Sequence, residues 1–206
     1  MFPKIVIVGN SMAGKTAWIH RVIGLNYEQT QTTVGADYFV PSVMFDRKEH
    51  SFEVWDIAGN ERNIELIPLF VKDAFLVLIF VDLSRPIIER AHVSLYIEGI
   101  QAAETPEKQF NKLFIGNNLD NALPESRETM RTISRQYDIP FIEMSVVEDD
   151  HFITLFEIVN MTDYFQSDLF LENEEKQWKR TKQNDEKEMK VQEKEDSSDD
   201  KKCVIS

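Results

Sequence analysis

Short apolar runs of strand length recur along most of the chain. They cover residues 4–8, 75–81, 113–115 and 140–144 and contain few polar residues. A continuous apolar run of this length is typical of a strand that is covered on both faces, and such strands are usually parallel. We therefore expect these runs to form the parallel centre of a buried sheet.

Residues 37–56 follow a different pattern, in which the charged turn DRKE joins two extended stretches, DYFVPSVMF and HSFEVWDI. This arrangement predicts an antiparallel hairpin. Helical patterns separate the apolar runs, at residues 15–23, 86–101, 124–137 and 150–165, and several begin with Pro or Asp, which favour the first helical turn. The alternation predicts an α/β doubly wound fold with a mixed, mostly parallel six-stranded sheet and helices on both faces.

The composition of the chain changes near its end. The 206 residues are 42% hydrophobic and suffice for one buried core. From residue 172 onward, aromatic and branched residues nearly vanish, and Lys, Glu, Gln, Asp and Ser take over. Such a segment buries too little apolar surface to order itself. We expect a domain at residues 1–171 and a flexible charged tail at residues 172–206.

The net charge of −13 argues against nucleic acid as a partner. Residues 1–171 carry 14 basic and 25 acidic side chains, so the folded part has no basic stripe for phosphates. No secretory signal pattern begins the chain, and no apolar run approaches the ~20 residues of a membrane span. A single cysteine leaves no internal disulfide framework. We therefore expect a cytosolic protein that does not bind nucleic acid.

The segment GNSMAGKT, at residues 9–16, has two glycines five positions apart followed by Lys and Thr, which is the pattern of a phosphate-binding loop. It follows an apolar run and opens a helical pattern, which disfavours the alternative of an ordinary turn. Backbone N–H groups would converge on phosphate, Lys15 would add a charge, and Thr16 would offer a Mg2+ ligand. The predicted nucleotide-binding residues of this loop are Gly9, Asn10, Ser11, Met12, Ala13, Gly14, Lys15 and Thr16.

The loop alone does not separate a GTPase from an ATPase or a small-molecule kinase. The segment GNNLD, at residues 116–120, directly follows the apolar run KLFI and therefore lies at the carboxyl edge of the predicted sheet, where open α/β sheets bind ligands. There the carboxylate of Asp120 could accept from two N–H donors that guanine has and adenine lacks. An isolated Asn-X-X-Asp is also a common polar turn, so this alternative stays open.

Three further segments carry a resemblance to a known family. TVGADY at residues 33–38, FEVWDIAGNER at residues 52–62 and LFVKDA at residues 69–74 are similar to the effector region and the second switch of Rab proteins. Up to about residue 165, the chain resembles a divergent Ras-superfamily small GTPase of the Rab branch. The resemblance implies a single GTPase domain.

The resemblance also implies roles for individual residues. Thr33 would bind Mg2+ together with Thr16 and sense the γ-phosphate, while Asp56 would hold the metal through water. Gly59 would donate its N–H to the γ-phosphate, and Tyr27 would stack against the edge of the base. Guanine would be contacted by Asn117, Asp120, Ser145 and the backbone of Val146.

The chain departs from the family pattern at its base-binding motifs and in its first switch. Asn118 and Val147 stand where the family normally has Lys, which implies a reduced nucleotide affinity. The first switch is one residue shorter than in typical Rabs, which bears on how Thr33 reaches the metal.

Asn60 replaces the Gln that orients the attacking water in this family. The missing methylene displaces the amide by about one carbon–carbon bond, and a misplacement of about 1 Å costs ~10²-fold in rate. With Lys15 and Thr33 as the other catalytic residues, we expect slow GTP hydrolysis that depends on an activating protein. A GTP-locked pseudo-GTPase that acts as an interaction module is the alternative, and a third possibility is that Asn60 is neutral.

The chain ends in KKCVIS, with its only cysteine at the fourth position from the end. Cys, two aliphatic residues and Ser form a prenylation motif, so we expect a lipid on Cys203 rather than a free thiol, with Ser206 favouring farnesyl. One lipid chain anchors reversibly, and the acidic EDSSDD segment weakens the contribution of Lys201 and Lys202 as a second signal.

Together these features predict a Rab-like GTP/GDP switch with Mg2+ as cofactor that recruits effectors at membranes in vesicle trafficking. The expected partners are a guanine nucleotide exchange factor, a GTPase-activating protein, effectors and a prenyl-binding chaperone. We expect a monomer on the cytoplasmic face of an intracellular or plasma membrane that exchanges with the cytosol. A Ras-like signalling GTPase is a lesser alternative, favoured by the chain end and disfavoured by TVGADY.

Overall fold

The computed structural model describes residues 2–28, 30–60, 64–86 and 90–163 of the chain. The chain divides after Ile158 into two compact units, and the fold below is that of the unit Phe2–Ile158. The predicted tail, including Cys203, lies outside the described residues.

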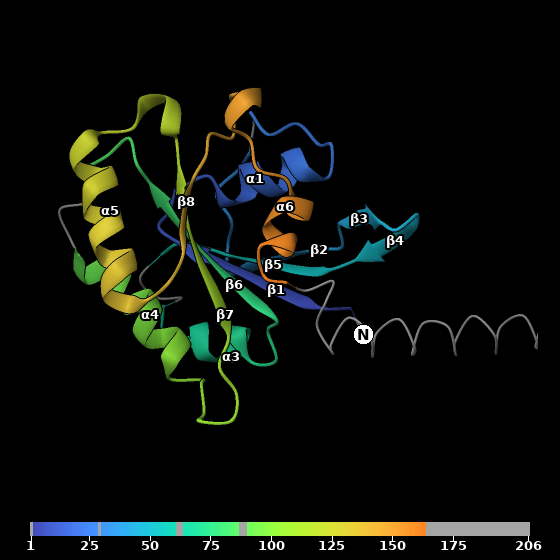
Figure 1. The fold of residues 1–206 in the computed structure, drawn as a ribbon, viewed down its shortest axis with the longest axis horizontal. Helices are drawn as coiled ribbons and strands as arrows, with labels where there is room; N and C mark the ends of the chain where they lie inside the picture. The colour runs from blue at the N-terminus through green and yellow to red at the C-terminus, as the bar shows by residue number, and fades with distance from the viewer. Residues whose placement is uncertain (1, 29, 61–63, 87–89, 164–206) are drawn as a thin grey trace, which may run out of the picture. The chain divides into compact units, whose positions relative to one another are not determined.

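A six-stranded sheet forms the centre of this unit (Figure 1). Its strands are β1 (Lys4–Gly9), β2 (Ala36–Phe39), β5 (Glu53–Ile57), β6 (Leu76–Asp82), β7 (Asn111–Asn117) and β8 (Phe141–Glu143). Their order is β2-β5-β1-β6-β7-β8, and only β2 runs antiparallel to its neighbour. The predicted α/β fold with a mixed, mostly parallel six-stranded sheet is therefore confirmed.

The predicted hairpin between residues 37 and 56 is present but is split into two sections. β2 pairs with β5 in the main sheet, while β3 (Ser42–Phe45) and β4 (Lys48–Ser51) form a separate two-stranded ribbon. The split falls at Pro41, which has no N–H to donate to a ladder. The Pro41 carbonyl instead accepts from the backbone N–H of Phe52 at 2.9 Å.

Three of the helices lie close to predicted positions, whereas α3 was not predicted. α1 and α5 begin where the sequence predicts them to begin, and α4 is described from Arg90 because residues 87–89 lie outside the described part. None of the helices among the described residues is long and apolar enough to cross a membrane. The helices are α1 (Lys15–Val22), α3 (Ile67–Val71), α4 (Arg90–Gln101), α5 (Pro124–Tyr137) and α6 (Leu155–Asn160), with short 3-10 turns η1 (Leu119–Asn121) and η2 (Asp149–His151).

The prediction of one helix over residues 150–165 is wrong in its first part, because α6 begins only at Leu155. The side chain of Thr154 accepts from the backbone N–H of Glu157 at 3.2 Å, and the Glu157 carboxylate accepts from the backbone N–H of Thr154 at 2.7 Å. This reciprocal capping box marks a helix start. The acidic residues at 149 and 150 therefore precede the helix instead of opening it.

The core lies on both faces of the sheet, as continuous apolar strands require. One face of β1, with Val6 and Val8, belongs to a cluster that includes residues of α3, α4 and α5. On the other face, Trp18 of α1 packs against Phe80 of β6 with ring centroids 5.9 Å apart. Figure 1 shows α4 and α5 on one side of the sheet and α1 on the other. Burial of both faces leaves the carboxyl edge of the parallel strands as the place for a ligand.

Candidate nucleotide-binding site

The phosphate-binding loop connects β1 to α1 and approaches other segments closely at two glycines. Gly9 has φ +135° and Gly14 has φ +87°. A Cβ on Gly9 would lie 2.1 Å from the carbonyl oxygen of Phe80, and a Cβ on Gly14 would lie 2.0 Å from Nδ2 of Asn117. Both positions therefore require glycine for backbone conformation and for space.

Lys15, the first residue of α1, bends back into this loop. Its Nζ donates to the carbonyl oxygens of Gly9 and Asn10, both at 2.9 Å. Burial lowers the pKa of Lys15, and the nearby Asp56 carboxylate opposes that shift. The loop thus contains a buried cation whose charge a bound phosphate would balance.

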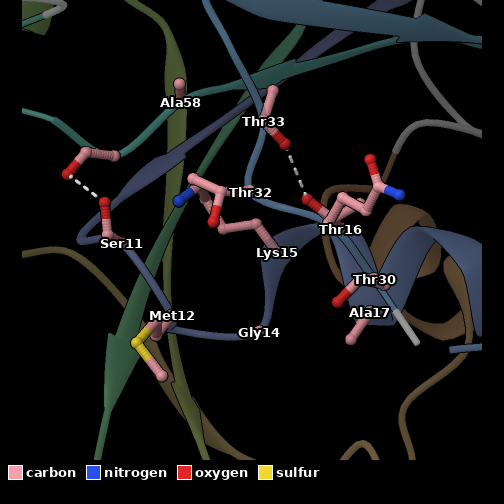
Figure 2. A pocket seen from close by; sticks show the side chains of 12 residues that line it. Ser11, Met12, Gly14, Lys15, Thr16, Ala17, Thr30, Thr32, Thr33 and Ala58 are labelled. Atoms are coloured by element: carbon pink, nitrogen blue, oxygen red, sulfur yellow. Dashed lines mark hydrogen bonds between the residues drawn. The ribbon is translucent and has the colours of Figure 1, made fainter. Parts of the chain in front are cut away.

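A cavity of about 380 Å³ opens in front of the loop (Figure 2). The phosphate-binding loop, the start of α1, the segment before β2 and the loop after β5 all contribute to its walls. Residues 30–32 were not among the predicted site residues, because their polar side chains match no binding motif. The lining residues are Ser11, Met12, Gly14, Lys15, Thr16, Ala17, Thr30, Gln31, Thr32, Thr33, Ala58 and Gly59.

Thr16 and Thr33 line the cavity, and both contact the buried Asp56. Oγ1 of Thr33 lies 3.0 Å from Oγ1 of Thr16 and donates to Oδ2 of Asp56 at 3.2 Å, and Thr16 also donates to that Oδ2. Asp56 is fully buried, and its Oδ1 has no hydrogen-bond partner among the described residues. Burial raises the pKa of Asp56, while the Thr16 hydrogen bond and the charge of Lys15 oppose the rise. Thr33 thus reaches Thr16 and Asp56, as the resemblance implies.

These three side chains fit a magnesium ion. Mg2+ takes oxygen ligands and is usually bound by one or two carboxylates together with water and substrate phosphates. The unpartnered Oδ1 of Asp56 is a buried acceptor of this kind, and a cation would offset the cost of burying its charge. No group of three or more His, Cys, Asp or Glu side chains that could hold a metal occurs among the described residues. A metal here would therefore rely on hydroxyl oxygens, water and phosphate as well.

The loop after β5 rests on the phosphate-binding loop. The carbonyl of Gly59 accepts from the backbone N–H of Ser11 at 3.1 Å and from its hydroxyl at 3.0 Å. Ala58 donates its N–H to the carbonyl of Gly35 at 2.9 Å, which ties this loop to the segment that follows Thr33. Asn60 comes next and is exposed.

The segments predicted to contact guanine also meet in space. Asn117 is buried, donates through Nδ2 to the carbonyl of Ala13 at 3.1 Å and accepts through Oδ1 from the backbone N–H of Val146 at 3.1 Å. The Ser145 hydroxyl donates to Oδ1 of Asp120 at 2.6 Å. Asn117 thereby joins the phosphate-binding loop to the segment after β8, and Ser145 orients the Asp120 carboxylate.

Asn118 and Val147 stand at the two positions where the resemblance implies a lysine in other members of the family. Asn118 has φ +61°, and its Nδ2 donates to Oδ1 of Asp82 at 2.7 Å. Val147 is 58% exposed. The structure therefore offers no lysine stem to pack on a base at either position.

The sequence did not indicate one residue that lies beside the segments predicted to contact guanine. Arg21, in the last turn of α1, lies with its guanidinium 5.3 Å from the centre of the Tyr27 ring. An arginine in a last helical turn is common because it complements the helix dipole, so its position gave no signal of a contact with this site.

The site combines three features: a glycine-containing loop between a buried strand and a helix, a buried lysine, and a group of two hydroxyls and a carboxylate. Together they define a P-loop nucleotide-binding α/β protein. The model of the Ras family matches residues 4–164, and the chain belongs to this family of small GTPases.

Curated relatives that the chain resembles include several Rab7-type proteins. Ras-related protein Rab-7b of Mus musculus is 25% identical over 159 residues, covering 76% of this chain and 79% of the relative. Rab7 of Drosophila melanogaster is 27% identical over 160 residues, covering 76% and 77%. Rab-7b of Paramecium octaurelia is 29% identical over 149 residues, covering 69% and 71%. The predicted resemblance to a divergent Rab-branch GTPase is confirmed.

Proposed function

We propose that this protein is a Rab-type switch that binds GTP and GDP with Mg2+ and hydrolyses GTP slowly without a partner. The observation that supports this most is the meeting of Thr33, Thr16 and Asp56 in front of the phosphate-binding loop. Thr33 comes from a segment that is separate in sequence from the loop and from β5. In this proposal its hydroxyl would detect whether the metal and the last phosphate are present.

In this proposal, each part of the site has one task. Backbone N–H groups of the phosphate-binding loop and Lys15 would bind the β- and γ-phosphates, while Thr16, Thr33 and, through water, Asp56 would bind Mg2+. The metal would neutralise charge that develops on the phosphates. Asn117, Asp120, Ser145 and Val146 would bind the guanine base.

The switch would consist of the two loops that contain Thr33 and Gly59. Both are attached by a few hydrogen bonds, from Thr33 to Asp56 and from Ser11 to Gly59. A γ-phosphate would add contacts to both loops, and its loss would remove them, which is the differential interaction that a two-state switch requires.

An apolar surface next to these loops supports the binding of effectors. Val34 is 90% exposed and Leu69 is 71% exposed. Tyr38 of β2 is 48% exposed, its ring lies 5.2 Å from that of Trp55 in β5, and the Trp55 ring lies 6.0 Å from that of Phe70. Exposed apolar groups gathered beside a switch favour recognition of a protein partner that reads its state.

Slow hydrolysis follows from Asn60. An unassisted Ras-type enzyme with Gln at this position turns over at about 3–5 × 10⁻⁴ s⁻¹, and an activating protein adds ~10⁵-fold. The shorter amide of Asn60 would slow the unassisted rate by up to ~10²-fold. A regulated protein would then depend on its activating partner, whereas a GTP-locked interaction module would respond to none.

The test is single-turnover hydrolysis of GTP bound to the full chain, with and without a Rab-type activating protein. It compares the wild type with Asn60→Gln and with Asn111→Gln, the same chemical change at the start of β7. Acceleration by both the partner and Asn60→Gln supports the switch. Acceleration by Asn60→Gln alone supports the locked module, and failure to bind GTP contradicts both.

We also propose that residues 1–171 are the GTPase domain and that residues 172–206 are a tether prenylated on Cys203. A prenylated tail would place a Rab-type switch at the cytoplasmic face of a membrane in vesicle trafficking, with a prenyl-binding chaperone returning it to the cytosol. Flotation of the prenylated full chain with liposomes, compared with Cys203→Ser, tests this part. Equal flotation of the two proteins would contradict it.

A further inference from the structure

Arg21 connects three segments that surround the proposed base site. Its guanidinium donates to the backbone carbonyl of Val146 and to the carboxylate of Asp149. It also lies 4.0 Å from the centre of the Phe152 ring and 5.3 Å from the centre of the Tyr27 ring. The Arg21 side chain is only 14% exposed, so these contacts exclude most water.

The contacts of Arg21 are not equal in strength. Asp149 is 94% exposed, so water and salt screen this ion pair and it contributes little. The hydrogen bond from a charged donor to the Val146 carbonyl is stronger than a neutral one. The flat guanidinium stacks on Phe152, which a lysine cannot reproduce in the same geometry. Val146 and Phe152 therefore dominate the effect of Arg21.

Val146 is fixed from two sides. Its N–H donates to Asn117 at 3.1 Å, and its carbonyl accepts from Arg21. Asn117 is itself attached to the phosphate-binding loop through Ala13. The backbone proposed to contact guanine is thus positioned by Asn117 from inside the fold and by Arg21 from α1.

This chain lacks the lysines that the family places at positions 118 and 147, and Asn118 is bound to Asp82 instead. Arg21 is a cation that touches both Tyr27 and the Val146 segment. We propose that Arg21 is a positioning residue for the guanine base, and that it keeps nucleotide release slow in the absence of these two lysines. This inference rests on the proposed function.

The experiment measures release of two Mg2+-bound nucleotides from the full chain. The first is GDP, and the second is the diphosphate of 2-aminopurine riboside, which resembles GDP but lacks both the oxygen at C6 and the hydrogen on N1 of the base. The backbone N–H of Val146 donates to Asn117 in the structure, and it could also donate to that oxygen as a shared, three-centre hydrogen bond, which is possible only in GDP. A residue that positions Val146 should therefore affect GDP more than the second nucleotide, whereas a general loss of folding should affect both equally.

We expect Arg21→Gln to accelerate GDP release by about 10- to 50-fold, as for the loss of one hydrogen bond from a charged donor. Release of the 2-aminopurine nucleotide should change by less than about threefold. Arg21→Lys should recover part of the difference because it keeps a donor but loses the stacking. Arg135→Gln, which removes an exposed arginine from the last turn of α5, is the matched control for the helix dipole and should change neither rate.

Phe152→Leu provides a second variant in case Arg21→Gln does not fold, since it keeps the arginine and removes the ring beneath it. It should accelerate GDP release by about 3- to 10-fold. Equal acceleration of both nucleotides by Arg21→Gln or Phe152→Leu, or no acceleration by either variant, overturns the role of Arg21. A wild type that binds neither nucleotide overturns the proposed function as well, and so the two failures are distinguishable.

Discussion

The contact between Gly14 and Asn117 joins the phosphate end of the proposed site to its base end, and Gly14→Ala tests it. The added Cβ would lie 2.0 Å from Nδ2 of Asn117. The Asn117 side chain would have to rotate, giving up its hydrogen bonds to Ala13 and Val146 at 3.1 Å each. Gly24→Ala is the matched control, because Gly24 has a similar φ of +75° and open space around its Cβ position.

Both substitutions place an alanine in a left-handed conformation, but only Gly14→Ala also breaks the hydrogen bonds of Asn117. A left-handed conformation costs an alanine about 1–2 kcal/mol, and the stiffer unfolded chain returns ~0.5–1 kcal/mol, so Gly24→Ala should lose roughly 0.5–1 kcal/mol. Gly14→Ala should lose a further ~2–4 kcal/mol, since each broken hydrogen bond leaves a buried group unsatisfied. For a chain of 150–250 residues this additional loss corresponds to roughly 4–16 °C in Tm.

Thermal unfolding of both variants should be measured at a fixed, saturating GDP concentration and again without nucleotide, because bound nucleotide adds its own stabilisation. The difference between Gly14→Ala and Gly24→Ala should persist without nucleotide, since the collision with Asn117 is internal to the protein. If the two variants lose the same stability, Asn117 does not join the two ends of the site as described, and the reasoning from Gly14 is refuted.

Three other predictions concern single groups. Burial raises the pKa of Asp56, and Mg2+ needs the ionised carboxylate, so Mg2+ affinity, measured through GDP release, should fall as the pH is lowered toward this raised pKa; a pH-independent affinity would contradict this. The hydrogen bond from Arg127 lowers the pKa of Glu143, so its stabilisation is complete above the unfolded value of about 4.3 and is lost as pH falls through the lower folded value. Arg127 is 37% exposed, so Glu143→Gln should change urea stability at pH 7 by less than about 1 kcal/mol. Met12 has φ +65°, so Met12→Gly should stabilise the chain by roughly 0.5–1 kcal/mol in the same urea assay, and a loss of stability would show that its side chain contributes more than its strain.

The sequence predicted the parts of the fold that depend on local pattern. The buried strands appear at the expected positions because continuous apolar runs leave a parallel sheet as the arrangement that covers both faces. The hairpin between residues 37 and 56 was also predicted, but its split was not, since the effect of Pro41 depends on which neighbour it faces. The last helix was predicted to begin at residue 150, before its actual start, because acidic residues favour a helix N-terminus without requiring one. The capping box formed by Thr154 and Glu157 marks the actual start and was not recognised in the sequence.

The site was predictable where its chemistry has a fixed spacing, as in the phosphate-binding loop. The meeting of Thr16, Thr33 and Asp56 was expected only from the resemblance, and the structure brings them together. Arg21 could not be found in this way. Its partners lie 125 or more residues further along the chain, apart from Tyr27, and no spacing rule connects a last-turn arginine to them.

In the proposed function, the departures at Asn60 and at Asn118 would act on different steps, and their combination would determine how the protein behaves as a switch. The fraction of molecules with GTP bound depends on the rate of nucleotide release relative to the rate of hydrolysis. Slow hydrolysis at Asn60 combined with fast release would keep the protein loaded with GTP and remove its control. If Arg21 keeps release slow, both rates remain low, and both an exchange factor and an activating protein are needed to move the switch.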